Sequence, residues 1–230
     1  MVTTIAKPKT KTVSLSTIIP LRGVSWSTYQ ALMREVGENR LWRIAYDRGV
    51  LEIQMPLLQH EEPKRLLESL IEAIVDELEI ELRSLGSLIL ERPDLKRAIE
   101  PDSCFYIQNE ARVRGKDEIN LAVDPPPDLA IESDYTNSSL NKFTIYGSLG
   151  IKELWRYSEG SLEVYLLKES GEYEKTDQSL VFPFLPLREV PEFMEQSKTQ
   201  GQRKAVGLFK ERIRALYLGG VSPRGRAQRV

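Results

Sequence analysis

The segment PPPDLAIESDYTNSSLNKFTIYGSLGIKELWRY (residues 125–157) carries the clearest structural signals in this chain. Proline cannot donate a hydrogen bond to a β-ladder, so the three prolines predict a strand that starts after them, over residues 128–133. A helix is expected over 139–149, because Gly150 provides a stop behind it. The segment therefore predicts a strand, a helix and another strand in close succession.

The flanks of this predicted helix are also defined by sequence. Asn137 or Ser138 has the side chain of a helix N-cap, because its oxygen accepts a hydrogen bond from the first turn. Beyond the helix, residues 151–157 and 161–167 both alternate in hydrophobicity around a short polar turn. This pattern predicts a β-hairpin.

Three elements are expected upstream. Apolar residues at helical spacing predict a helix over 25–39. Residues 41–47 and 50–56 alternate around a short turn and predict another hairpin. The longest apolar stripe predicts a helix that begins at Pro63, a favoured first helical position, and ends near Gly86.

The remaining elements complete the predicted fold class. Strands are expected over 87–91 and 104–108, and a loop with some extended pairing over 109–124. A single basic helix is expected over 190–217. Helices and strands in this order indicate an α/β or α+β domain, with one central mixed sheet flanked by helices.

The 230 residues are expected to form one domain. A chain of this length buries about 70–75% of its unfolded surface and needs no disulfide or structural metal. Residues 1–20 are predicted to be a flexible leader and residues 21–218 the domain. Residues 219–230 are basic and lack an apolar pattern, so a disordered tail is predicted there.

Charge is distributed unevenly along the chain. The net charge is −2, yet residues 1–12 sum to +3 and residues 203–230 to +7, which leaves −12 for the body between them. Basic ends on an acidic body are suited to holding nucleic acid near a carboxylate-rich site, and the basic last helix is expected to contact phosphates. The alternative is that both ends are only solvated.

Composition excludes several classes of site. One cysteine, Cys104, excludes an internal disulfide and a cysteine-based zinc finger, and one histidine, His60, excludes a multi-histidine metal site. No apolar run is long enough to cross a bilayer, so no membrane partner is expected. The first residues lack the apolar core of a secretory signal, and the protein is expected to be cytoplasmic.

Carboxylates gather beside the predicted strands. Glu132 and Asp134 are two residues apart on one strand face, at about 7 Å, whereas Asp128 lies about 13 Å from Glu132. Asp102, just before the strand at 104–108, is the expected partner from a neighbouring strand. Such oxygen ligands favour Mg²⁺ or Mn²⁺ over zinc. The alternative is structural: Asp128 caps the proline turn and Glu132 pairs with an arginine.

Lys142 is an unusual residue for the buried side of a helix. On the predicted helix at 139–149, its side chain points to the same side as the apolar residues, where burial of an unpaired ammonium is costly. It is expected either to reach Glu132 or to extend over Tyr146 toward water. His60 and Glu61 stand near the start of the long helix, where the histidine either positions water or phosphate or simply caps the surface.

These motifs together resemble those of a known family. GVLEIQMP followed by His60, then EPDSCFYIQN, PPPDLAIE and SLNKFTIYGSLGIKELWRY are similar to the Uma-two family of restriction-endonuclease-like proteins, over about residues 22–193. The resemblance implies a PD-(D/E)xK nuclease fold, a mixed sheet flanked by helices with acids at a strand fork. It also implies roles: Asp102 matches the first motif aspartate, Glu132 the strand-end acid and Lys142 the lysine. His60 and Tyr146 match a family histidine and tyrosine.

The function expected from this resemblance is Mg²⁺- or Mn²⁺-dependent endonuclease cleavage, with DNA as partner and a homodimer as a plausible assembly. The two motif acids would hold the ion with the Ser133 carbonyl, and Lys142 would orient water or stabilise the transition state. Asp134 holds the usual lysine place of the motif and would bind a second ion or fix Lys142. His60 and Glu61 would support the site. The alternative is an inactive nuclease fold that binds nucleic acid or protein.

Overall fold

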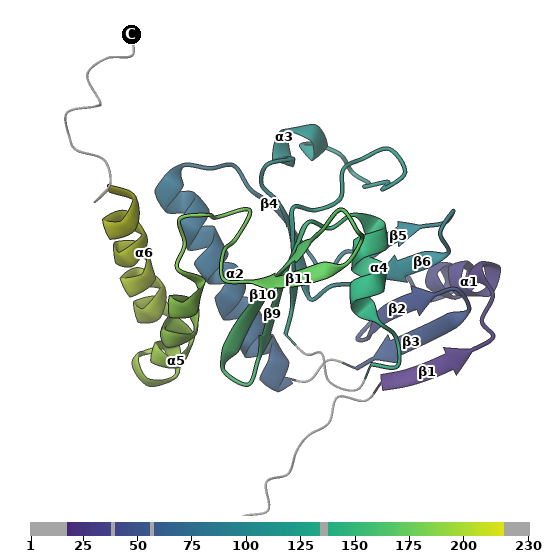
Figure 1. Cartoon of the computed structure of the whole chain (residues 1–230). Coiled ribbons are helices and arrows are strands. Elements are labelled where there is room, and N and C mark those ends of the chain that lie inside the picture. The colour runs from purple at the N-terminus through teal and green to yellow at the C-terminus, as the bar shows by residue number, and fades with distance from the viewer. Residues whose placement is uncertain (1–17, 38–39, 56–57, 134–137, 219–230) are drawn as a thin grey trace, which may run out of the picture.

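The computed structural model describes residues 18–37, 40–55, 58–133 and 138–218, and within these ranges the strands form two sheets (Figure 1). We call the first the N-terminal sheet; its strand order is β1 (Ile18–Arg22), β3 (Val50–Gln54), β2 (Arg43–Asp47), β6 (Arg97–Ile99), β5 (Leu90–Arg92). The second is the central sheet, in the order β11 (Tyr173–Thr176), β10 (Ser161–Leu167), β9 (Glu153–Ser158), β8 (Leu129–Glu132), β7 (Ser103–Tyr106), β4 (Arg83–Gly86). The mixed α+β class is confirmed, but the prediction of one sheet is wrong.

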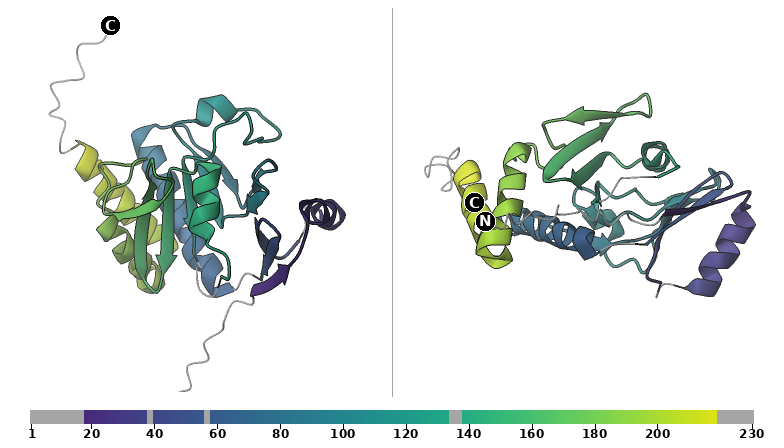
Figure 2. Two further views of the ribbon diagram at one scale, coloured as in Figure 1. Left: turned by 45° about the vertical axis from the view of Figure 1, so that its right-hand side comes forward. Right: turned by 90° about the horizontal axis from the view of Figure 1, so that it is seen from below.

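Helices and sheets alternate in layers along the molecule (Figure 2). The helices are α1 (Trp26–Val36), α2 (Leu58–Leu78), the short α3 (Glu110–Val113), α4 (Lys142–Leu149), α5 (Val190–Gln200) and α6 (Gln202–Leu218). One apolar cluster joins α2, α5 and α6 to one face of the central sheet. A second joins the other face to α4 and the N-terminal sheet, and a third joins that sheet to α1. Helix α4 therefore lies between the two sheets.

Alternation along β8 sets the direction of its acid. Leu129 and Ile131 belong to the cluster beneath α2, whereas Ala130 belongs to the cluster around α4. Because successive side chains of a strand point to opposite faces, Glu132 shares the α4 face with Ala130. Strand β8 pairs parallel with β9, so α4 is the crossover that such a connection needs.

Two helix boundaries differ from prediction. Helix α2 begins at Leu58, so Pro63 lies inside it; packing of its apolar face on the central sheet supports the helix despite the lost backbone hydrogen bond. The helix ends at Leu78, well before Gly86, because Glu79 adopts a left-handed conformation and the Ile80 amide bonds back to the Val75 carbonyl at 3.0 Å. Because the helix ends at Leu78, residues 83–86 are available to form β4.

Local conformation also corrects other expectations. The predicted helix over 190–217 is two helices, α5 and α6, divided at Gly201, whose φ of 90° interrupts helical geometry. Helix α4 is capped by Asn141, later than expected, while the stop at Gly150 is confirmed. The expected loop at 109–124 includes α3, and the strand expected over 87–91 is displaced to β5.

The domain boundary at the start also shifts. Ile18–Arg22 pairs antiparallel with β3, so residues 18–20 of the expected leader lie in a strand. The rest of the predicted leader and the predicted tail, residues 219–230, lie outside the described residues. Among the helices that are described, none combines the length and apolar character needed to cross a membrane.

Two glycines test these helix assignments in opposite directions. Gly150 ends α4 at φ 81°, where an alanine is strained, so Gly150→Ala should lower the free energy of unfolding by about 1–2 kcal/mol. Gly207 lies inside α6 with open space where a Cβ would be, so Gly207→Ala should raise it by about 0.5–1 kcal/mol. Urea denaturation measures both. Equal effects of the two changes would contradict the assignments.

Candidate active site

A buried ion pair joins α4 to the end of β8. The Lys142 ammonium lies 3.1 Å from Glu132 Oε2, and both side chains are nearly inaccessible to solvent. The Tyr146 hydroxyl, one turn further along α4, donates to Glu132 Oε1. Of the two directions expected for Lys142, the structure therefore shows the one toward Glu132.

Electrostatics raise the pKa of both members of this pair, which favours the charged form of Lys142 and disfavours that of Glu132. Burial raises the pKa of Glu132, and the nearby charge of Asp102 raises it further, while the Lys142 ammonium and the Tyr146 hydroxyl lower it. Burial acts to lower the pKa of Lys142, but the charges of Glu132 and Asp102 outweigh it, so this pKa lies above its usual value. A buried ammonium needs such an anion to remain protonated.

Asp102 lies at the start of β7, beside Glu132. Its amide donates to the Ile131 carbonyl at 3.1 Å, which holds it against β8. Cys104, two residues later, packs in the α4 cluster, which is the face that Glu132 also occupies. Asp102 Oδ2 accepts hydrogen bonds from the Ser133 amide at 2.5 Å and from the Ser133 hydroxyl. The structure thus brings Asp102, Glu132, Ser133, Lys142 and Tyr146 together.

Arg43 is a member of this site that sequence reasoning missed. Its guanidinium donates to Asp102 Oδ1 and, at 2.9 Å, to Glu61 Oε1. Glu61 thereby joins the site through Arg43, and Lys64 lies next to it, with its ammonium 3.7 Å from Glu61 Oε2. An arginine at the start of a strand is usually exposed to solvent, so the sequence around Arg43 does not indicate that it contacts Asp102.

Two further side chains come from β3. The Lys142 ammonium lies 3.3 Å from Gln54 Oε1. Glu52, two residues earlier on the same strand face, accepts hydrogen bonds from Ser138, Ser139 and the Leu140 amide, at 2.5–3.0 Å. Because these residues directly precede α4, Glu52 fixes the segment that presents Lys142. The available signal in the sequence was a glutamate among the apolar residues of a predicted strand, because a charged side chain is buried there only when it is paired.

Other candidate residues have different outcomes. Asp128 accepts hydrogen bonds from the Ile107 and Asn109 amides, at 2.7 and 2.9 Å, so its role is structural, but it secures the chain that leaves β7 instead of the proline turn that was expected. Glu132 pairs with a lysine and not with the arginine of its own alternative. Residue 60 belongs to α2, but the His60 side chain and the whole of Asp134 lie outside the described residues.

The oxygen donors of the site fit a hard divalent ion. In the described ranges, no three His, Cys, Asp or Glu side chains are grouped closely enough to enclose a metal. Mg²⁺, however, is usually held by one or two carboxylates together with water and substrate phosphate. Asp102 and Glu132 supply two carboxylates on one sheet face, and each carboxylate oxygen has about two lone pairs, so their protein hydrogen bonds do not exhaust them.

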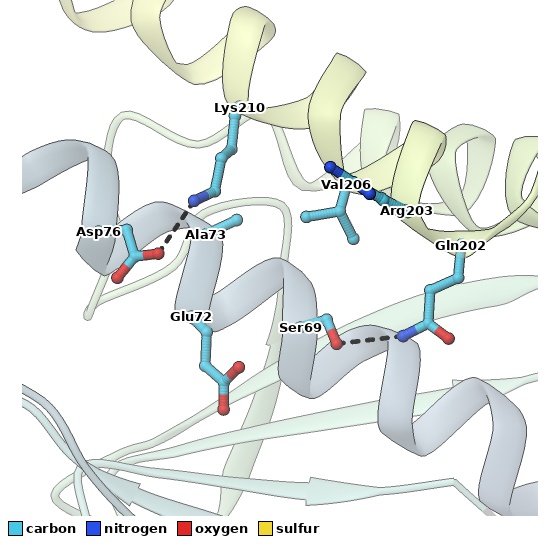
Figure 3. Close-up of a pocket in the computed structure, with 8 residues that line it drawn as sticks. All are labelled: Ser69, Glu72, Ala73, Asp76, Gln202, Arg203, Val206 and Lys210. Atoms are coloured by element: carbon cyan, nitrogen blue, oxygen red, sulfur yellow. Dashed lines mark hydrogen bonds and ion pairs between the residues drawn. The ribbon is translucent and has the colours of Figure 1, made fainter.

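Three cations of the basic helix α6 pair with acids of the protein. Lys210 pairs with Asp76 of α2 at 2.9 Å in the groove between the two helices (Figure 3). Arg214 pairs with Glu77 of α2, and Arg212 with Glu189 beside α5. These three ion pairs connect the helices, and the contact of α6 with phosphates stays a prediction.

Removal of the buried ammonium should make stability depend on pH. In Lys142→Met, Glu132 loses the charge that lowers its pKa, so its carboxyl binds a proton on folding over a wider pH range. Stability is then greatest below the pKa of the unfolded state, about 4.3, and falls as pH rises through the folded value. Urea denaturation should show a loss of about 3–5 kcal/mol at pH 8 and a smaller loss at pH 5.

Lys175→Met is the matched control for this change. Lys175 pairs with Glu163 at 2.8 Å on the exposed surface of the central sheet. Its removal should cost less than about 1 kcal/mol at either pH. A loss in Lys142→Met that is the same at pH 5 and pH 8 would show that Glu132 is not held charged by Lys142.

Three comparisons with known proteins bear on the family, and the match to a family model decides it. No curated protein matches the chain. A solved structure, described as a "putative nuclease belonging to DUF820" from Anabaena variabilis, is 19% identical, with a TM-score of 0.48; the match covers 69% of this chain and 88% of that one. The family model described as "Putative restriction endonuclease" matches residues 26–195, a span that includes every side chain of the site. The chain therefore belongs to the Uma2 (Uma-two) family.

Proposed function

We propose that this protein is a Mg²⁺- or Mn²⁺-dependent endonuclease that hydrolyses phosphodiester bonds in DNA. The observation that carries the proposal is the buried Lys142–Glu132 pair, with Asp102 beside it on the same sheet face. Burial of two carboxylates and an ammonium is costly for stability alone, and perturbed charged groups of this kind concentrate at functional sites. Membership of the Uma2 family favours nuclease chemistry for them.

Asp102, Glu132 and the Ser133 carbonyl are the proposed ligands of the ion. When bound, the ion would polarise a phosphoryl oxygen and lower the pKa of a water molecule. Glu61 lies nearby through its contact with Arg43 and is the proposed support for this ligand set.

Lys142 and Tyr146 have distinct proposed roles. The Lys142 ammonium keeps its proton because its pKa is raised beside Glu132 and Asp102, so it stabilises the negative charge that develops on the phosphate. The Tyr146 hydroxyl holds Glu132 in one orientation by donating to Oε1. Gln54 and Glu52 position Lys142 from the neighbouring sheet.

A homodimer suits this activity. Cleavage of both strands of a duplex needs two active sites, and a two-fold axis relates two such sites to the two-fold symmetry of the DNA backbone. We propose that the protein acts on duplex DNA as a homodimer, with phosphate contacts that do not read sequence.

A second candidate function is an inactive nuclease fold that binds nucleic acid or protein. The observation that favours it is that Asp102 and Glu132 already accept hydrogen bonds from cations and hydroxyls of the protein, namely Arg43, Ser133, Lys142 and Tyr146. A site with internal charge balance is stable without any ion. This candidate predicts DNA binding without cleavage.

Cleavage of supercoiled plasmid in Mg²⁺ or Mn²⁺ tests the proposal. The parent should convert the plasmid to nicked and linear forms, and EDTA should stop the reaction. Glu132→Gln and Lys142→Ala should each lower the rate by at least about a hundredfold, because the first removes the charge of a proposed ion ligand and the second removes the cation that stabilises developing charge.

Asp47→Asn is the control for these changes. Asp47 lies on β2 and pairs with Arg97 at 2.8 Å, at the opposite end of the strand from Arg43, so its loss should leave the rate within about threefold of the parent. Parent activity that survives both site changes would reject the assignment of the site. Parent protein that binds but never cuts DNA would favour the second candidate.

A further inference from the structure

Arg43 lies between two of the carboxylates to which the proposed function gives a part in ion binding. Its guanidinium bridges Asp102 Oδ1 and Glu61 Oε1, from the first residue of β2. Asp102 is a proposed ion ligand and Glu61 a proposed support, so a protein cation already lies between two groups assigned to the ion. The Arg43 side chain is 13% exposed.

The charges around Arg43 hold it there. Burial acts to lower the pKa of Arg43, but the charges of Asp102, Glu61 and Glu132 raise it above its usual value. The guanidinium thus lies within the field of the same carboxylates that would attract a divalent ion. Hydrogen bonds from a guanidinium to carboxylates are among the strongest in proteins, because both groups are ionised.

A divalent ion bound to Asp102 would lie close to the Arg43 guanidinium. A guanidinium and a divalent ion repel each other, and the repulsion is strong where water is largely excluded. Asp102 Oδ2 already accepts two hydrogen bonds from Ser133, so Oδ1 is the oxygen left for an ion. That oxygen is the one that Arg43 holds.

We propose that Arg43 competes with the divalent ion for Asp102, so that ion binding requires release of the guanidinium from Oδ1. The inference rests on the proposed function for the identity of the ion. Arg43 is in this view a positioning residue: it holds Asp102 in the ion-free protein and sets how tightly the ion binds. Because Glu61 also binds the guanidinium, the released side chain stays in the site.

Isothermal titration of the full-length protein with MnCl₂, without DNA, tests the competition. Arg43→Gln should bind Mn²⁺ about ten- to a hundredfold more tightly than the parent, the factor expected when a hydrogen bond to a charged group no longer has to be broken. Arg43→Lys keeps the charge but lacks the two-pronged guanidinium, and should fall between the two.

Arg97→Gln is the matched control. Arg97 has similar exposure, 11%, and pairs with Asp47 within the same sheet, but it does not contact the site acids. Its Mn²⁺ affinity should equal that of the parent. If Arg97→Gln tightens binding as much as Arg43→Gln, the effect is one of general loosening and the proposal is wrong.

A double variant shows whether one carboxylate is shared. Asp102→Asn removes the charge of the carboxylate for which Arg43 and the ion compete, so Arg43→Gln should add little Mn²⁺ affinity when combined with it.

Thermal unfolding gives a second readout. Arg43→Gln should melt at a lower temperature than the parent in EDTA, and saturating Mn²⁺ should raise its melting temperature more than that of the parent. If the variant is unfolded in EDTA, Mn²⁺ should restore its fold.

The outcomes separate this inference from the proposed function. Equal or weaker Mn²⁺ binding by Arg43→Gln, including no binding by either protein, overturns the competition even if the parent cuts DNA. Tighter binding by Arg43→Gln together with a plasmid that remains uncut supports the competition and rejects the nuclease. The Mn²⁺ affinities alone decide the competition, and plasmid cleavage alone decides the proposed function.

Discussion

The burial of the Lys142 ammonium against Glu132 is the constraint on which the arrangement of this protein depends. An ammonium in the interior is tolerated only beside an anion, and the anion in turn needs donors for its other oxygen. Helix α4 meets both needs from one position, because Lys142 and Tyr146 lie one turn apart and reach the two oxygens of Glu132. The helix accordingly lies between two sheets, with β8 of the central sheet on one side and the N-terminal sheet on the other (Figure 1).

The two sheets contribute different parts of the site. The central sheet supplies the acids, Asp102 and Glu132, from the ends of neighbouring strands. The N-terminal sheet supplies Arg43 and Gln54, which are directly opposite each other in the β2–β3 register, so their side chains share one face. Charges from one sheet thus balance charges from the other. A site built this way resists opening, because separation of the sheets would leave buried ions without partners.

Charge elsewhere in the molecule serves assembly of the fold. The cations of α6 that pair with acids of α2, and Arg212 beside α5, fasten the C-terminal helices to the layer beneath the central sheet. Net charge by segment, which makes this region strongly basic, does not show such pairing, since it ignores which acids lie opposite.

The sequence by itself determined the elements whose signals are local: the strand after the prolines, the helix stopped by Gly150, both hairpins, and the association of Asp102, Glu132 and Lys142 through family motifs. Alternation and capping act over a few residues, so a single chain displays them. Only the tertiary structure decided that the strands divide into two sheets and that Arg43, Glu52 and Gln54 enter the site. Gln54 lies 88 residues before Lys142, and no local pattern encodes that contact. It exists because α4 is packed between sheets, and packing depends on the whole chain.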